Sequence, residues 1–249
     1  MTVLGLLLIG IFLPLFPFSM AFNAVLERVT QPLLRSALLL AWPQVGLWAL
    51  STQTAEIPSW LLVWALATSL LYAFRLLAMR EIGRWTGFLA TSAWALLWLP
   101  TYAGIQPSQL WTFAAGFSLP LVFLTLLAQV LEHHFGAAYT GLYGGLARRM
   151  PRFSGVLVIS VLAATATPIF PTFFAMLHAL IVSQPVPAIV LTGIWLIWSW
   201  AAARLLQGLI VGPAEPSPEL DLPIAATWGY AVGLAGLVAA GLFLTGSRL

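Results

Sequence analysis

The sequence predicts an all-α membrane protein that crosses the bilayer about eight times, and composition and spacing together predict it. Hydrophobic residues make up 61% of the 249 residues and charged residues only 7%, which is too little polar surface to solvate a soluble domain. Apolar runs of membrane-spanning length recur along the whole chain. The connections between them are short, so we expect a single integral membrane domain covering residues 1–249.

The eight expected spans are apolar runs bounded by arginines, prolines and glycines. We interpret the first as a retained span rather than a signal peptide, because it has neither a basic start nor a small-residue cleavage site. The ranges are residues 2–22, 36–52, 58–79, 85–104, 110–131, 154–182, 187–211 and 224–245.

The arginines predict the orientation of these spans. The chain contains no lysine, and nine of its ten arginines fall in the odd-numbered connections, which leaves only Arg248 on the other side. Basic residues collect on the cytoplasmic side of membrane proteins. We therefore expect a multi-pass protein of a bacterial-type inner (plasma) membrane with both termini outside.

Two spans carry prolines that predict interrupted helices, because proline removes a backbone donor and disfavours helix before it. In span six the pair is Pro168 and Pro171, and in span two Pro43 stands beside Gln44 and near Gly46. In a bilayer, protein or water must satisfy the freed carbonyls. We therefore expect spans two and six to face each other inside the protein, as a partial inverted repeat with a central ion site.

Several functions are excluded by the residues present. Without cysteine the chain has no thiol nucleophile, iron–sulfur cluster or thiolate zinc site. It also lacks a phosphate-binding glycine loop, a Ser-His-Asp arrangement and an H-E-x-x-H motif. We therefore expect no enzyme activity, no cofactor, no metal and no nucleic-acid partner. The twelve tryptophans, Trp94, Trp98 and Trp198 among them, are expected mostly at the membrane interface.

The motifs resemble those of the antiporter-like subunits of respiratory complex I, Mrp-type cation/proton antiporters and inorganic-carbon uptake complexes. In that family a GGL-x-x-x-x-P loop precedes a discontinuous helix, and the layout of GGLARRMP and TPIFPTFFAM is similar. PLLRSALL, ALLLAWPQVG, the stretch ending TGFLATSAW and LEHHFG follow the family's order over most of the chain. The resemblance implies a scaffold built for moving protons or cations.

The chain departs from the family where the family moves protons. The family relays protons through buried Lys and Glu, whereas by the resemblance Gln44 and Met176 stand at the two relay positions of the broken helices. The span-five lysine has no counterpart. Met1 corresponds to about the family's sixth helix, so we expect a shortened form without the earlier essential Glu. Gln does not take up a proton near neutral pH, so we expect no complete proton path.

The remaining polar candidates each allow two interpretations. His178, near the span-six break, could titrate in a pathway or could be a core histidine bonded to a freed carbonyl, and we favour the second. Glu132, His133 and His134 are adjacent and so do not share a helix face, which favours a solvated helix end over a metal site. Two connections could dock a partner or simply be solvated; their charged residues are Arg148, Arg149, Arg152, Glu215, Glu219 and Asp221.

We expect an accessory membrane subunit of a multi-subunit proton- or cation-coupled complex, packed beside a full-length antiporter-like paralogue and not conducting ions itself. Candidate hosts are an inorganic-carbon uptake complex and a complex I-like or Mrp-like assembly. The alternative is an autonomous transporter or channel that uses the broken helices. Expected partners are therefore other membrane subunits and the lipid bilayer.

Overall fold

The computed structural model describes residues 3–52, 57–141, 144–213 and 221–246. These residues are almost entirely helical, and apart from an isolated bridge between Glu81 and Tyr139 they contain no β-structure. The helices are α1 (Val3–Phe12), α2 (Met20–Arg28), α3 (Pro32–Ser51), α4 (Ser59–Ala78), α5 (Ile82–Ala95), α6 (Trp98–Tyr102), α7 (Pro107–Phe135), α8 (Leu146–Arg149), α9 (Pro151–Ala164), α10 (Pro171–Ile181), α11 (Pro185–Ile210) and α12 (Ile224–Gly246).

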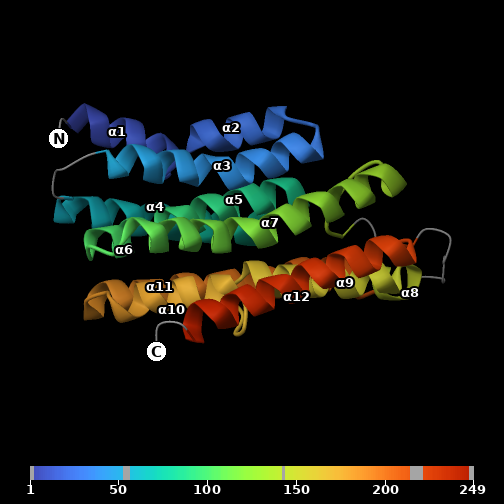
Figure 1. The fold of residues 1–249 in the computed structure, drawn as a ribbon. Coiled ribbons are helices and arrows are strands. Elements are labelled where there is room, and N and C mark those ends of the chain that lie inside the picture. The colour runs from blue at the N-terminus through green and yellow to red at the C-terminus, as the bar shows by residue number, and fades with distance from the viewer. Residues whose placement is uncertain (1–2, 53–56, 142–143, 214–220, 247–249) are drawn as a thin grey trace.

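The helices run side by side along one direction, as expected for a multi-pass membrane protein (Figure 1). In the described part of the chain, five of them are long and apolar enough to cross a bilayer, namely α3, α4, α7, α11 and α12. Three further passes consist of shorter helices placed end to end, namely α1 with α2, α5 with α6 and α9 with α10. The all-α membrane fold class is thus confirmed, and each of the eight expected ranges overlaps one of these passes.

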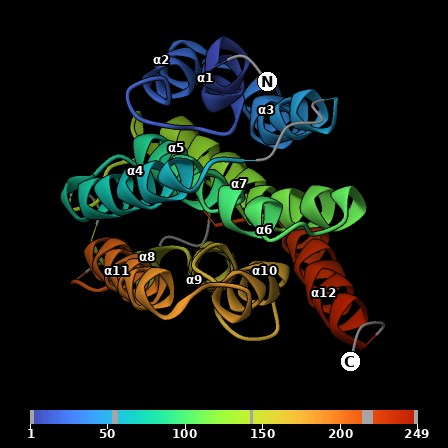
Figure 2. The same ribbon diagram turned by 90° about the vertical axis from the view of Figure 1, so that its left-hand side faces the viewer.

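The passes form three layers (Figure 2). The first contains α1, α2 and α3, the middle one α4 to α7, and the third α8 to α12. The core lies in the middle layer, where α5 is buried from Trp85 to Ala95. This helix therefore lines the interior rather than lipid.

The interruption expected in span six is present. Helix α9 ends at Ala164 and α10 begins at Pro171. Between them, Ala166 and Ile169 have φ angles of +57° and +80°. Positive φ is uncommon for alanine and a genuine outlier for a β-branched isoleucine, so the backbone of this break is strained.

The interruption expected in span two is absent, and that prediction was wrong. Helix α3 runs unbroken from Pro32 to Ser51 with Pro43 buried inside it. A single proline removes one donor, and the hydrogen bonds on either side can hold the helix together. Span six differs because two prolines three residues apart interrupt consecutive turns.

Span one is broken by a proline pair as well. Helix α1 ends at Phe12 and α2 begins at Met20, and the interval contains Pro14 and Pro17. The sequences P-L-F-P (14–17) and P-I-F-P (168–171) are nearly identical, and the two passes run in opposite directions (Figure 1). This is the relation that an inverted repeat requires. The two breaks lie on opposite sides of the middle layer (Figure 2), so they do not face each other.

Candidate functional site

The first break, residues 13–19, is closed by side chains of neighbouring helices. Three tryptophans donate indole hydrogen bonds to carbonyls that the interruption leaves without helical partners, and the Thr68 hydroxyl accepts from a backbone amide. The pairs are Trp42 to Ile11 O (3.0 Å), Trp98 to Leu13 O (3.2 Å), Trp64 to Phe16 O (2.6 Å) and Phe16 N to Thr68 Oγ1 (3.0 Å).

Helix α3 can approach this break closely because it carries a glycine there. A Cβ atom built on Gly46 would lie 2.9 Å from Leu13 Cγ and 3.0 Å from the Leu13 amide nitrogen. Real Cβ atoms do not approach other atoms so closely. Gly46, singled out in the sequence for its place beside Pro43, therefore lies against the break in span one.

The second break, residues 165–170, is closed mainly by backbone contact with α12. A Cβ atom on Gly241 would lie 2.8 Å from the Ile169 carbonyl oxygen and 3.1 Å from the Pro171 nitrogen. On the other side, the Thr172 hydroxyl donates to the carbonyl of Ala163 at the end of α9. Helix α12 thus covers this break with its backbone, whereas tryptophan side chains cover the first.

Between the breaks, three hydrogen-bonded groups of buried polar side chains meet on α5. We call these nine residues the polar axis: Ser19, Asn23, Ser69, Tyr72, Thr91, Ser92, Trp94, Ser118 and Trp198. On the side of the first break, Ser19 bonds Tyr72 (2.9 Å) and Asn23 donates to Thr91 (3.0 Å).

The other two groups continue from α5 toward α7 and the third layer. Trp94 donates to Ser118 of α7 (3.1 Å). Ser92 bonds Ser69 of α4 (3.0 Å) and accepts from Trp198 of α11 (2.9 Å). The polar axis therefore connects all three layers through neutral side chains.

The expected interfacial position was wrong for Trp94, Trp98 and Trp198, which are fully buried. Each of these three has an acceptor inside the protein, so burial leaves none of their three indole donors unpaired. Trp48, Trp60, Trp200 and Trp228 are exposed, as an interfacial position requires. The polar axis itself had no strong sequence signal beyond Thr91, Ser92 and Trp94 standing together in an uncharged stretch.

The polar axis consists only of hydroxyl, amide and indole groups. These groups exchange hydrogen bonds but do not change charge near neutral pH. A relay that stores a proton at each step needs groups whose pKa lies near the working pH. The axis can therefore hold the layers in register, and it offers no site for such a proton.

The three residues expected at a pathway lie outside the polar axis. Gln44 is half-buried on α3, donates to Trp111 O at 3.2 Å, and keeps its own side-chain oxygen buried without a protein partner. Met176 is fully buried in α10. His178, one half-turn further on, has its ring 5.1 Å from that of Phe113.

The ionisable residues gather at one end of the bundle. Of the Asp, Glu, Arg and His side chains that the structure describes, all but His178 lie near the end where α2, α4, α7 and α11 finish (Figure 1). The sequence expectation places this end in the cytoplasm. Its charges are therefore solvated or paired rather than carried into the membrane.

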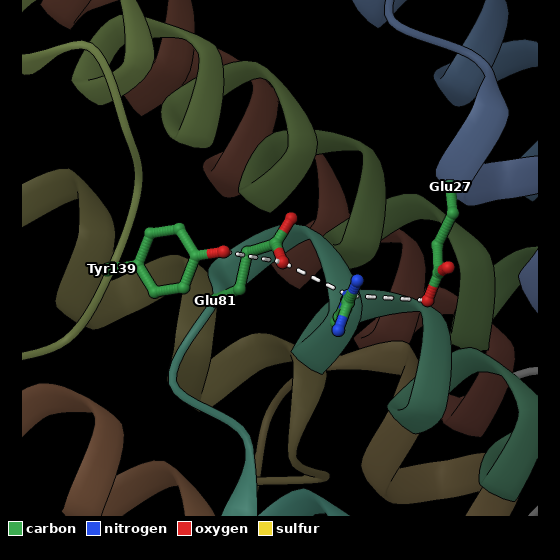
Figure 3. Close-up of polar contacts among 4 residues, drawn as sticks. Glu27, Glu81 and Tyr139 are labelled. Atoms are coloured by element: carbon green, nitrogen blue, oxygen red, sulfur yellow. Dashed lines mark hydrogen bonds and ion pairs between the residues drawn. The ribbon is translucent and has the colours of Figure 1, made fainter.

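One charged cluster at this end joins α2, α5 and the 136–141 loop (Figure 3). The Arg84 guanidinium lies 3.3 Å from the Glu27 carboxylate and 3.2 Å from that of Glu81. Tyr139 donates to Glu81 at 3.2 Å. The Glu81 carboxylate raises the pKa of Tyr139, first through its charge and then through this hydrogen bond, because both disfavour an ionised phenol.

Of the charged residues expected in partner-docking connections, Asp221 and Arg152 make hydrogen bonds within the protein. The Asp221 carboxylate accepts from the backbone amides of Arg152 and Phe153, both at 3.0 Å, and so caps the start of α9. Arg152 donates to Leu222 O at 3.0 Å. These two residues therefore tie α12 to α9. Glu215 and Glu219 lie outside the described residues.

Two arginines of the same region remain as surface candidates. Arg148 is exposed on α8, and Arg149 is half-buried with its guanidinium 6.0 Å from the ring of Phe135.

No metal site is formed within the described ranges, because no group of three or more His, Asp or Glu side chains there lies close enough to hold an ion. Glu132, His133 and His134 sit in the last turn of α7.

Comparison with known proteins gives structural similarity without sequence matches. No family model matches the chain, and no curated protein sequence matches it. A chain of respiratory complex I from Thermus thermophilus superposes with a TM-score of 0.81 over 94% of this chain, at 21% identity. A chain of the Mrp complex from Dietzia sp. DQ12-45-1b gives a TM-score of 0.79 over 95% of this chain, at 13% identity. A chain of the membrane-bound sulfane sulfur reductase, an archaeal respiratory membrane complex, gives 0.79 over 95%, at 14%.

These similarities confirm the expected resemblance at the level of the fold. Of the three assemblies named above, respiratory complex I and an Mrp complex are among those expected from the motifs. The chain spans about half the length of the solved chains it matches, from 51% to 55%. The shared fold is therefore that of a part of each of those chains.

Proposed function

We propose that this chain is an accessory membrane subunit of a multi-subunit ion-translocating complex, and that it supports translocation without carrying ions itself. The neutral polar axis carries the proposal. It occupies the centre of a fold shared with chains of complex I and Mrp assemblies. Its donors and acceptors satisfy one another, and none of its groups changes charge near neutral pH.

Two further observations support a packing role. Both breaks are closed by protein: tryptophan side chains donate hydrogen bonds to carbonyls of the first, and α12 lies in backbone contact with the second. Met176, at a relay position by the family resemblance, is fully buried among apolar neighbours. A path that opened at Met176 would have to displace this packing.

The sharpest test is His178→Leu. Among the Asp, Glu, Arg and His residues that the structure describes, only His178 lies away from the charged end of the bundle. We expect the complex to assemble and to pump at the wild-type rate in proteoliposomes. His133→Leu, on the exposed last turn of α7, is the matched control. Normal assembly of the His178 variant with loss of pumping would overturn the accessory role and favour a direct ion path through this chain.

The polar axis provides a second test of the same proposal. Ser92→Ala removes a hydroxyl that bonds both Ser69 and Trp198, which should lower stability by about 1–3 kcal/mol because buried donors lose their partner. We expect the pumping rate per assembled complex to stay unchanged. If pumping fell while stability and assembly did not, the axis would be a conduit rather than a support.

The subunits that accompany this chain would identify its host complex. We propose a full-length antiporter-like paralogue as the neighbour, in an inorganic-carbon uptake, complex I-like or Mrp-like assembly. Purification in mild detergent followed by mass spectrometry should recover such a paralogue. A chain that purifies alone and transports ions by itself in liposomes would instead be an autonomous transporter.

We also propose that the arginine-bearing end lies in the cytoplasm, which puts both termini outside, in a bacterial-type inner membrane. The chain has no cysteine, so single introduced cysteines report without background. Ala147→Cys on α8 and Gln184→Cys before α11 are exposed positions at opposite ends. An impermeant reagent should label Gln184→Cys, and not Ala147→Cys, from outside the cell. The reverse labelling pattern would invert the assignment.

A further inference from the structure

We propose that a cavity at the arginine-bearing end, between α4 and α11, binds an anionic phospholipid. The cavity has a volume of about 1080 Å³. Its walls are the last turns of α4, the last turns of α11 and the loop around Tyr139 to Gly141. Helices α4 and α11 lie at the same edge of the bundle (Figure 2), so the cavity stands where the protein meets the bilayer.

The charge of the cavity favours an anion. Arg80 and Arg204 both line it, and the described residues of its lining include no Asp or Glu. Both arginines are exposed, and neither makes an ion pair or side-chain hydrogen bond with the part of the protein that the structure describes. Arg84, by contrast, is held between Glu27 and Glu81. The two unpaired guanidiniums can therefore face a phosphate, which arginine binds through parallel N–H groups.

The remaining walls favour a lipid over a free anion. Phe74 and Leu77, in the last two turns of α4, line the cavity and keep part of their apolar surface accessible. Phe74 is 55% exposed on the outer face of α4. A phosphate ion would leave these apolar surfaces uncovered, whereas acyl chains would cover them while the head group meets the arginines. Basic pockets between membrane helices bind acidic lipid head groups in this way.

The loop that forms the third wall is fixed before any ligand arrives. The Thr140 amide donates to Arg80 O at 2.7 Å, and the Gly141 amide donates to Gly208 O at 3.0 Å. The Ile82 amide donates to Ala138 O at 3.0 Å. These bonds join the loop to the ends of α4 and α11 and to the start of α5. The cavity is thus pre-organised, which lowers the entropic cost of binding.

The experiment is a lipid titration of the full chain, purified in mild detergent with any subunits that stay bound. Native mass spectrometry would measure binding of phosphatidylglycerol, with phosphatidylcholine as the neutral comparison. We expect affinity for phosphatidylglycerol to fall about fivefold for Arg80→Gln or Arg204→Gln and about 30-fold for both together. Phosphatidylcholine binding should not change. The matched control is Arg28→Gln, an exposed arginine at the same end but outside the cavity.

Other variants and competitors separate the alternatives. A double Arg→Lys variant, which keeps both charges, should retain affinity within a few-fold and shows that the fold tolerates substitution. Displacement of phosphatidylglycerol by millimolar inorganic phosphate would indicate a free-anion site and overturn the proposal. So would loss of a bound subunit with unchanged lipid affinity, which would indicate a protein partner. Reduced stability of the variants with unchanged lipid affinity would show that the two arginines only stabilise the C-terminal ends of α4 and α11. That result would also overturn the proposal.

Discussion

The two breaks share the pattern P-x-F-P, yet the protein closes them by different means. At the first break, indole groups from α3, α4 and α6 reach the freed carbonyls. At the second, the backbone of α12 comes within contact distance at Gly241, and Ala166 and Ile169 adopt positive φ. The difference teaches that two prolines open the helix, while the neighbouring helices decide how the exposed backbone is covered.

The two solutions should respond differently to mutation. Side-chain donors can be removed one at a time, so damage to the first break should come in increments. The second break relies on one close approach between main chains, which cannot adjust without moving a whole helix. A substitution that removes one side-chain donor should therefore weaken only the first break, and one that adds bulk to α12 should weaken only the second.

Gly241→Ala should have the largest effect. The added Cβ would lie 2.8 Å from the Ile169 carbonyl oxygen, so α12 must move away from the second break, at a cost of about 3 kcal/mol. Thermal unfolding in detergent measures the loss. Gly236→Ala on the same helix meets nothing within 4 Å and should be neutral or slightly stabilising, since alanine favours helix. Equal behaviour of the two variants would refute closure of the break by α12.

Trp64→Phe should weaken the first break by about 1 kcal/mol, because the Phe16 carbonyl loses its indole donor. Trp60→Phe is the matched control, one turn earlier on α4, where the indole is 48% exposed and its ring lies 6.0 Å from that of Trp64. Unfolding midpoints of the two variants can be compared directly. An equal shift in both would mean that the ring, and not its hydrogen bond, stabilises the break.

Ile169→Gly should stabilise the protein by roughly 0.5 kcal/mol. Glycine adopts positive φ without the cost of about 1–2 kcal/mol that an L-residue incurs, and its greater freedom in the unfolded chain cancels part of the gain. The control is Ile159→Gly within α9, where the side chain is similarly exposed at 45% and glycine should destabilise. Destabilisation by Ile169→Gly would show that side-chain contacts outweigh the strain.

The smallest effect concerns the charged end, away from both breaks. Because Glu81 raises the pKa of Tyr139, the neutral phenol stabilises the fold below the unfolded pKa of about 10, and this contribution is lost as the pH rises through the folded pKa. Tyr139 is too exposed for a large change in stability. The absorbance difference between wild type and Tyr139→Phe should titrate at lower pH in the Glu81→Gln background. An unchanged midpoint would contradict the role of the carboxylate.

Much of the fold could be predicted from the sequence, because membrane spans are long apolar runs whose ends carry arginine. The break at Pro168 and Pro171 was predicted for the right reason. The break in span one was missed because Pro14 and Pro17 stand in a uniformly apolar run, while Pro43 beside polar Gln44 looked like the stronger interruption. Comparison of the chain with itself would have found the repeated P-x-F-P pattern.

The polar axis could not be predicted in the same way. Serine, threonine and tryptophan are common in membrane helices, and each residue alone gives little indication of burial. The bond between Trp198 and Ser92 joins residues 106 positions apart. Which hydroxyl meets which indole depends on how three layers pack, and hydrophobic periodicity reports only which face of each helix turns inward.

The neutrality of the polar axis has a consequence for how this protein experiences the membrane voltage. An electric field across a bilayer does work on charge, about 2.3 kcal/mol for each elementary charge moved through 100 mV. Apart from His178, the described Asp, Glu, Arg and His side chains lie near one end of the bundle, so there is almost no charge inside for the field to displace. In the proposed complex, a neighbouring subunit whose charged groups move during transport would thus contact a subunit whose shape does not depend on the membrane voltage.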